Sequence, residues 1–109
     1  MKQRKIPERE LLGGIMKPQL GFGTWLLNEE EAYRVTKMAV KDFGYRMVDT
    51  AKMYKNEEGV GRALKECFDE GIVKREEMFI TTKLWIDGRS RVEQELRESL
   101  QRLKLDYVD

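Results

Sequence analysis

The sequence predicts an α/β fold built around a parallel sheet, because short apolar stretches alternate with longer segments whose apolar residues recur at helical spacing. Strands are expected near residues 20–23, 46–49, 78–83 and from 106, and helices near 29–43, 57–70 and 90–103. The strand centres are about 27 to 32 residues apart, close to the roughly 31 residues per unit of an eight-unit barrel. The chain is therefore predicted to form the N-terminal portion of a (β/α)8 TIM barrel, with about three and a half βα units.

A β-hairpin is expected ahead of the first parallel strand, over about residues 9–17. Gly13 and Gly14 stand between two short apolar segments and suit a tight two-residue turn. Such a hairpin would close the bottom of the barrel. Residues 1–109 are expected to form one partial barrel domain, since this length suits one ordinary domain at most.

Capping signals mark the ends of the predicted helices. Asn28 and Glu31 have the spacing of a capping box, and Gly44 suits a left-handed stop after the first helix. Ser90 and Glu93 have the same capping-box spacing at the start of the third helix. On the first helix, the buried stripe is expected to comprise Ala32, Val35, Met38, Ala39 and Val40 or Phe43.

The composition excludes several classes of function. A net charge of +1 gives no sign of nucleic-acid or anionic-membrane binding, and no apolar run approaches the roughly 18 residues of a membrane span. The chain has one cysteine, Cys67, and no histidine, which excludes a disulfide framework, the usual zinc sites and histidine-activated nucleophiles within these residues. No metal is expected, and the cysteine usage fits a reducing, cytoplasmic location. Cys67 itself falls on an apolar helix face and is expected in the core.

An acid ends the second predicted strand. Asp49 follows two apolar residues, Tyr54 lies in the loop behind it, and Lys83 ends the next apolar run. Buried carboxylates are rare unless they are paired, so Asp49 needs a partner, and Lys83 is the best candidate. Because the C-terminal ends of parallel strands meet on one face of the fold, we expect the three side chains to converge there.

An aspartate, a tyrosine and a lysine together can transfer a proton. A free tyrosine titrates near about 10, and a nearby ammonium favours the phenolate. With Asp49 holding Lys83 charged, Tyr54 could protonate a carbonyl oxygen while a second group delivers hydride to the carbon. The same residue types are also compatible with a turn cap at Asp49, a rim position for Tyr54 and a solvated strand end at Lys83.

Two glycine pairs only partly match a dinucleotide-binding fingerprint. Gly21 and Gly23 lie in a predicted strand, and Gly59 and Gly61 lie in a predicted helix. Neither pair is followed by a third glycine at the required offset, so no Rossmann-type site is predicted.

Four segments together resemble the aldo-keto reductase family, over about residues 15–109. They are PQLGFGTW (18–25), GYRMVDTAKMYKNEEGVGRALKE (44–66), GIVKREEMFITTKLW (71–85) and SLQRLKLDYVD (99–109). The resemblance implies a (β/α)8 barrel that reduces aldehydes and ketones with NADPH. The cofactor would lie extended across the barrel mouth, without a Rossmann fold.

The resemblance also implies roles for individual residues. The family's catalytic set maps onto Asp49, Tyr54 as general acid and Lys83 as the group that assists it. The residues expected beside the cofactor are Gly23, Thr24, Trp25 and Asp49, the last of which would touch the nicotinamide ribose. The residues expected around the substrate are Trp25, Tyr54 and Trp85, although both tryptophans would also suit packing at the top of the barrel.

Part of the family pattern has no counterpart in these residues. The fourth catalytic residue, a histidine, would follow just after Asp109, and strands five to eight, most cofactor phosphate contacts and the substrate-selecting loops are missing. Two hypotheses follow. In the first, the chain is a fragment of a reductase that acts on a small-molecule carbonyl. In the second, it is a non-catalytic half-barrel that self-associates through its open sheet edges and acts as an interaction module.

Overall fold

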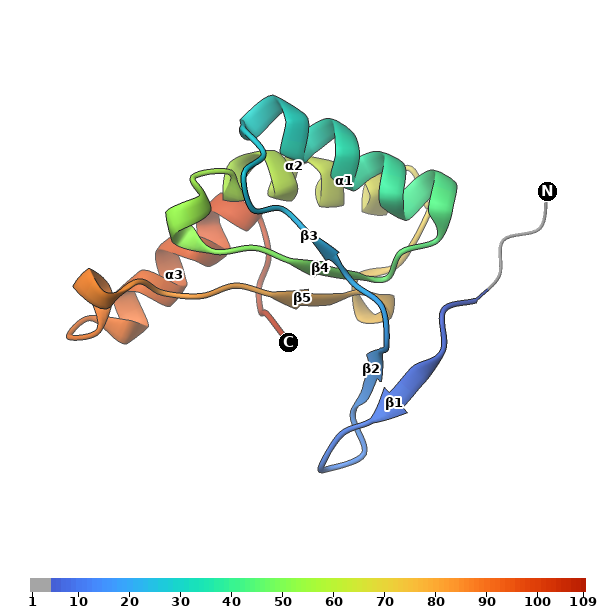
Figure 1. Ribbon diagram of the computed structural model, residues 1–109, viewed down its shortest axis with the longest axis horizontal. Coiled ribbons are helices and arrows are strands. Elements are labelled where there is room, and N and C mark those ends of the chain that lie inside the picture. Colours follow the sequence, from blue (N-terminus) through green and yellow to red (C-terminus); the bar gives the residue numbers. More distant parts are fainter. Residues whose placement is uncertain (1–4) are drawn as a thin grey trace.

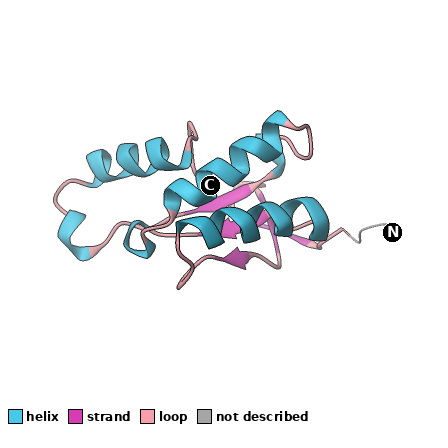
Figure 2. Ribbon diagram, turned by 90° about the horizontal axis from the view of Figure 1, so that it is seen from above, coloured by secondary structure: helices cyan, strands magenta, loops and turns pink. Residues whose placement is uncertain are grey.

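A computed structural model describes residues 5–109 and shows a parallel sheet with helices on one face (Figure 1). The sheet comprises β3 (Phe22–Gly23), β4 (Met47–Asp49) and β5 (Phe79–Thr81), hydrogen-bonded in that order. The helices are α1 (Glu29–Phe43), α2 (Glu57–Asp69) and α3 (Val92–Leu103). Seen from above, α2 lies between α1 and α3 (Figure 2). The parallel pairing and the strand–helix order confirm the predicted α/β class.

The predicted strand from residue 106 is not formed. The Asp109 N–H donates to the Ile80 carbonyl at 2.9 Å, as a neighbouring parallel strand would. The Ile80 N–H, however, is taken by the Asp109 carboxylate at 3.0 Å, where strand pairing would supply a backbone carbonyl. Residues 106–109 therefore lie against β5 without joining the sheet.

The predicted hairpin is confirmed, with a longer turn. It pairs β1 (Glu8–Glu10) with β2 (Met16–Pro18) in antiparallel register. The Leu11 N–H donates to the Ile15 carbonyl at 2.7 Å, so the turn includes the residue before the two glycines. Both glycines have positive φ values, 88° at Gly13 and 82° at Gly14, a conformation that glycine adopts at little cost. The hairpin lies below the sheet in Figure 1, beyond the start of β3.

The ends of α1 follow the predicted capping chemistry, whereas the start of α3 does not. Glu31 N–H donates to the Asn28 side chain at 2.8 Å, the Glu31 carboxylate accepts from Asn28 N–H at 3.1 Å, and Gly44 caps the helix at φ 73°. The α3 N-cap is Arg91, which makes no side-chain capping bond. Ser90 belongs to the preceding turn, which closes when Arg91 N–H donates to the Gly88 carbonyl at 2.9 Å, so the predicted Ser90 cap is wrong.

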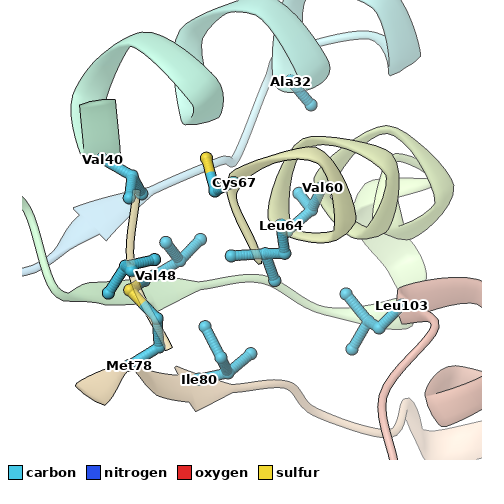
Figure 3. Close-up of a cluster of buried hydrophobic side chains, with 10 residues drawn as sticks. Ala32, Val40, Val48, Val60, Leu64, Cys67, Met78, Ile80 and Leu103 are labelled. Atoms are coloured by element: carbon cyan, nitrogen blue, oxygen red, sulfur yellow. The ribbon is translucent and has the colours of Figure 1, made fainter. Parts of the chain in front are cut away.

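The hydrophobic core lies between the sheet and α2. Figure 3 shows Val48 and Ile80 pointing from β4 and β5 towards Leu64 on α2, with Leu103 closing the side. All four side chains are fully buried. Cys67 lies in the same cluster, as expected, and its burial raises the pKa of its thiol, which makes the residue a poor nucleophile.

The second glycine pair lets the helices approach closely. A Cβ atom at Gly59 would collide with the Glu29 carbonyl at the start of α1. A Cβ atom at Gly61 would lie 2.5 Å from the Arg102 carbonyl at the end of α3. The two glycines therefore allow α2 to pack closely against α1 and α3. Across residues 5–109, no helix has the length and apolarity needed to cross a membrane.

Candidate active site

The register of the sheet places the candidate residues on the face that the helices leave open. Gly23 pairs with Asp49, and Asp49 pairs with Thr81, while the residues one step earlier point to the core. Side chains alternate between the two faces of a strand, so Asp49 and Thr81 share one face. Both end their strands on the C-terminal side, where parallel α/β folds gather functional groups.

Lys83 and Asp49 form an ion pair, as predicted. Lys83 Nζ lies 2.8 Å from Asp49 Oδ1 and 2.9 Å from Oδ2, and it also donates to the Thr50 carbonyl at 3.0 Å. The Thr81 hydroxyl donates to Asp49 Oδ1 as well, a contact that the sequence reasoning did not identify. Burial alone would lower the pKa of Lys83, but the bonds to Asp49 outweigh it and the pKa is raised. The lysine is therefore held charged.

Tyr54 lies beside this ion pair. It ends the short 3-10 turn η1 (Lys52–Tyr54), and Lys83 Nζ lies 5.2 Å from the centroid of its ring. Tyr54 also helps to raise the pKa of Lys83, through its charge and a side-chain hydrogen bond, so the ammonium lies near both expected partners. The hydrogen bonds of 2.8 to 3.0 Å from the ammonium go to the two Asp49 oxygens and the Thr50 carbonyl.

A small cavity opens at these residues. It has a volume of about 170 Å³ and is lined by Ala51, Met53, Tyr54, Lys83, Leu84 and Trp85. The predicted substrate residues Tyr54 and Trp85 therefore meet at one cavity. Trp25 is 67% exposed and does not line it, so the structure does not bring the third member of that predicted set to the same place.

The residues expected beside a cofactor have different environments. Gly23 is exposed, and a Cβ atom there would meet nothing within 4 Å, so its surface is open. Thr24 has no exposed surface, and its hydroxyl donates to the Asp49 carbonyl at 3.2 Å. In this conformation Thr24 holds the loop after β3 against the end of β4, and its exposed neighbours Gly23 and Trp25 are the ones that a ligand can touch.

Asn56 was missed as a site residue because it was interpreted only as a helix start. Its side chain is fully buried and makes no capping bond to α2. Its amide donates to the Thr24 carbonyl at 2.7 Å and the Leu27 carbonyl at 2.9 Å, and its oxygen accepts from the Thr50 hydroxyl at 3.0 Å. Asn56 thereby fixes the loop that carries Trp25 to the loop that carries Tyr54.

Glu57 was missed for the same reason. An acidic residue in the first turn of a helix usually faces water, but this one is only 2% exposed. Its carboxylate accepts from Arg102 Nε at 2.8 Å, the Thr82 hydroxyl at 2.7 Å and the Ser99 hydroxyl at 3.3 Å. These bonds join the start of α2 to α3 and to the residue before Lys83. Charge and hydrogen bonds together satisfy a carboxylate that would be costly to bury alone.

Solved structures share this architecture. The aldo-keto reductase of Bombyx mori, in complex with NADP, superposes with a TM-score of 0.89 at 38% sequence identity, over 97% of this chain and 37% of that one. An aldo/keto reductase from Brucella melitensis superposes with a TM-score of 0.87 at 39% identity, over 100% of this chain and 40% of that one. The chain thus has the fold of the N-terminal portion of a (β/α)8 barrel, as predicted.

Curated proteins match in sequence as well. Methylglyoxal reductase DkgA of Escherichia coli strain K12 is 49% identical over 100 residues, or 92% of this chain and 34% of that protein. Glycerol 2-dehydrogenase (NADP(+)) of Saccharomyces cerevisiae is 51% identical over 96 residues, or 88% of this chain and 29% of that protein. The chain spans about a third of the length of these relatives. The model of the Aldo/keto reductase family matches residues 19–109, and the chain belongs to this family.

Proposed function

We propose that this chain supplies the N-terminal part of an NADPH-dependent reductase of small aldehydes or ketones, in which Tyr54 donates the proton. The observation that carries the proposal is the Asp49–Lys83 ion pair, held beside Tyr54 at a small cavity. The names of the relatives support the reaction class, since they include a methylglyoxal reductase and a glycerol 2-dehydrogenase (NADP(+)).

The proposed reaction assigns a separate task to each side chain. The Tyr54 hydroxyl gives its proton to the carbonyl oxygen as hydride adds to the carbonyl carbon, and the product is an alcohol. The phenolate that remains is stabilised by the Lys83 ammonium, 5.2 Å from the ring centroid. Asp49 keeps that ammonium charged and fixed, and Thr81 helps to orient the carboxylate.

The residues at the end of β3 and β4 fit a nicotinamide cofactor, which supplies hydride when it is bound. Gly23 leaves an open surface next to Asp49, where a flat ring or a ribose can approach the backbone. The Asp49 side chain is 40% exposed, and among residues 5–109 its Oδ2 atom accepts only from Lys83, so it can also accept from a ribose hydroxyl. Trp25 offers an exposed aromatic face beside this surface.

The experiment that tests the proposal restores the remainder of the barrel. In a chimera, these 109 residues replace the matching segment of the Escherichia coli methylglyoxal reductase, and NADPH oxidation is followed with methylglyoxal. We expect turnover, and we expect Tyr54→Phe to lower kcat by about 10²- to 10⁴-fold, the usual contribution of a general acid. The dissociation constant for NADPH should change little.

Tyr107→Phe is the matched control, because Tyr107 packs under Arg75 at the other end of β5 and its change also removes one hydroxyl. It should leave kcat unchanged. Equal activity of the Tyr54→Phe chimera and the unmodified chimera would contradict the proposal. The 109-residue chain alone should show no turnover, because positioning of both reactants supplies roughly 7–11 kcal/mol of the barrier.

The open sheet favours a second candidate, self-association of the chain. Within residues 5–109, β3 and β5 form the two edges of the three-stranded sheet; residues 106–109 lie against β5, which leaves β3 as the open edge. Large apolar side chains are also exposed, among them Leu20 at 52% and Ile86 at 61%. Unpaired edges and apolar surface both promote association. Light scattering after gel filtration should show oligomers, and a monodisperse monomer with one sharp melting transition would exclude this candidate.

A further inference from the structure

A buried carboxylate lies behind the two loops that form the cavity. Glu95, in the first turn of α3, is only 2% exposed. Its Oε2 atom lies 2.6 Å from Lys52 Nζ, and its Oε1 atom accepts from the Arg91 guanidinium at 3.3 Å. The bond from Lys52 opposes the effect of burial and holds the pKa of the Glu95 carboxyl below its usual value. The carboxylate is therefore charged at neutral pH.

Lys52 connects this carboxylate to the turn that carries Tyr54. Lys52 is the first residue of η1, and Tyr54 is the last. Its backbone N–H donates to the Lys83 carbonyl at 3.1 Å, while its ammonium reaches Glu95. The start of the turn is thus attached to Lys83 through the Lys52 backbone and to α3 through the Lys52 side chain.

Gly88 connects the same carboxylate to the turn that follows Trp85. Gly88 is buried in η3 (Ile86–Gly88), and its N–H donates to the Trp85 carbonyl at 2.9 Å. A Cβ atom at Gly88 would lie 2.7 Å from Glu95 Cγ and 2.9 Å from Cδ. Any other residue at position 88 would therefore displace the Glu95 side chain from its present position.

We propose that Lys52, Glu95 and Gly88 form a clamp that sets the separation between Tyr54 and Trp85, the two aromatic walls of the cavity. The clamp touches neither of these rings, so its members are positioning residues. It governs how well a small carbonyl compound fits between the rings, and thus its affinity, more than the proton transfer itself. This inference rests on the proposed function, because it assumes that the cavity receives the substrate.

A fluorescence experiment tests the clamp without requiring catalytic activity of the chain. The chain has two tryptophans, so Trp25→Phe leaves Trp85 as the only one. In that background, Glu95→Gln should increase the acrylamide quenching of Trp85, because the turn after it moves more freely. Lys52→Arg preserves the charge and should retain the original quenching. Glu93→Gln removes an exposed carboxylate that pairs with Arg97 on the same helix, and it should have no effect.

A kinetic experiment in the chimera tests the consequence for substrate binding. Glu95→Gln should raise KM for methylglyoxal by about tenfold, since small displacements of positioning groups have large effects, while kcat falls much less. Lys52→Arg, which preserves the charge, should retain the original KM. If the unmodified chimera is inactive, the proposed function fails, and the fluorescence experiment still decides whether the clamp exists.

The clamp is distinguished from an ordinary stabilising ion pair by these two measurements. If Glu95→Gln lowers the melting temperature but leaves Trp85 quenching and KM unchanged, the proposal is overturned. Should Glu95→Gln fail to fold, Lys52→Met serves in its place, because Glu95 keeps its contact with Arg91. The Lys52→Met chain is then expected to show the same rise in quenching and in KM, and unchanged values would again overturn the proposal.

Discussion

On β4 and β5, the side chains of Val48 and Ile80 point to α2 and are fully buried. One residue further along each strand, Asp49 and Thr81 point to the open face and form a hydrogen bond with each other. The same backbone hydrogen bonds between β4 and β5 hold the buried pair and the open-face pair in place. The period of two along a strand thus places core residues and candidate-site residues next to one another in the sequence. Substitutions on the two faces should therefore change different properties of the protein.

The largest expected effect on stability lies on the helix-covered face. Ile80→Ala removes buried methyl groups from the cluster of Val48, Leu64 and Leu103, and it should lower the free energy of unfolding by about 2–5 kcal/mol. Urea unfolding followed by circular dichroism would measure the change. A loss well under 1 kcal/mol would mean that the core is not tightly packed at this strand.

A smaller effect is expected from the neighbouring residue on the open face. Thr81→Val keeps the shape of the side chain but removes the hydroxyl that donates to Asp49. The free energy of unfolding should fall by about 1 kcal/mol, the usual net value of one hydrogen bond. Water can replace the lost donor, because Thr81 is not fully buried. A loss as large as that of Ile80→Ala would remove the distinction between the two faces.

The smallest effect is expected from Lys83→Met, and it should depend on pH. The ion pair is 49% exposed at Lys83 and 40% at Asp49, and exposed pairs contribute only about 0–1 kcal/mol. Because the pKa of Lys83 is raised above its ordinary value of 10.5, this contribution is present at neutral pH and is lost as pH rises through the folded-state pKa. The stability difference between the two chains should therefore shrink above pH 10.5. A constant difference would contradict the assignment.

Local rules recover much of the fold. The capping box of Asn28 and Glu31 is a short-range interaction, so sequence spacing is enough to locate the start of α1. The apolar stripe of α1 was less accurate, because spacing does not decide which edge of the stripe faces the neighbouring helix. Thr36 is buried there, while Met38, which was expected in the stripe, is 37% exposed, and Phe43, one of two alternatives for its end, is 62% exposed.

The pairing of Asp49 with Lys83 could be predicted because both residues end apolar strands, and strand ends of a parallel sheet converge. The sequence could not predict the burial of three polar residues near helix starts, because solvated caps are common at such positions. These residues are Asn56, Glu57 and Glu95. Only the packing of α3 and the loops shows that they are buried. Their partners lie 25 or more residues away, apart from Arg91 beside Glu95 and Thr50 beside Asn56.

The close approach of α2 to its two neighbours also limits how this gene segment can vary. Every amino acid that a single-base change can substitute for glycine carries a Cβ atom, and such an atom has no room at Gly59 or Gly61. In a library that covers every codon of α2, these two positions should accept the fewest alternatives. Lys65 on the same helix, with a 58% exposed side chain, should accept most of them. Within α2, amino-acid substitution would thus be most restricted at its two glycines, the residues that have no side chain.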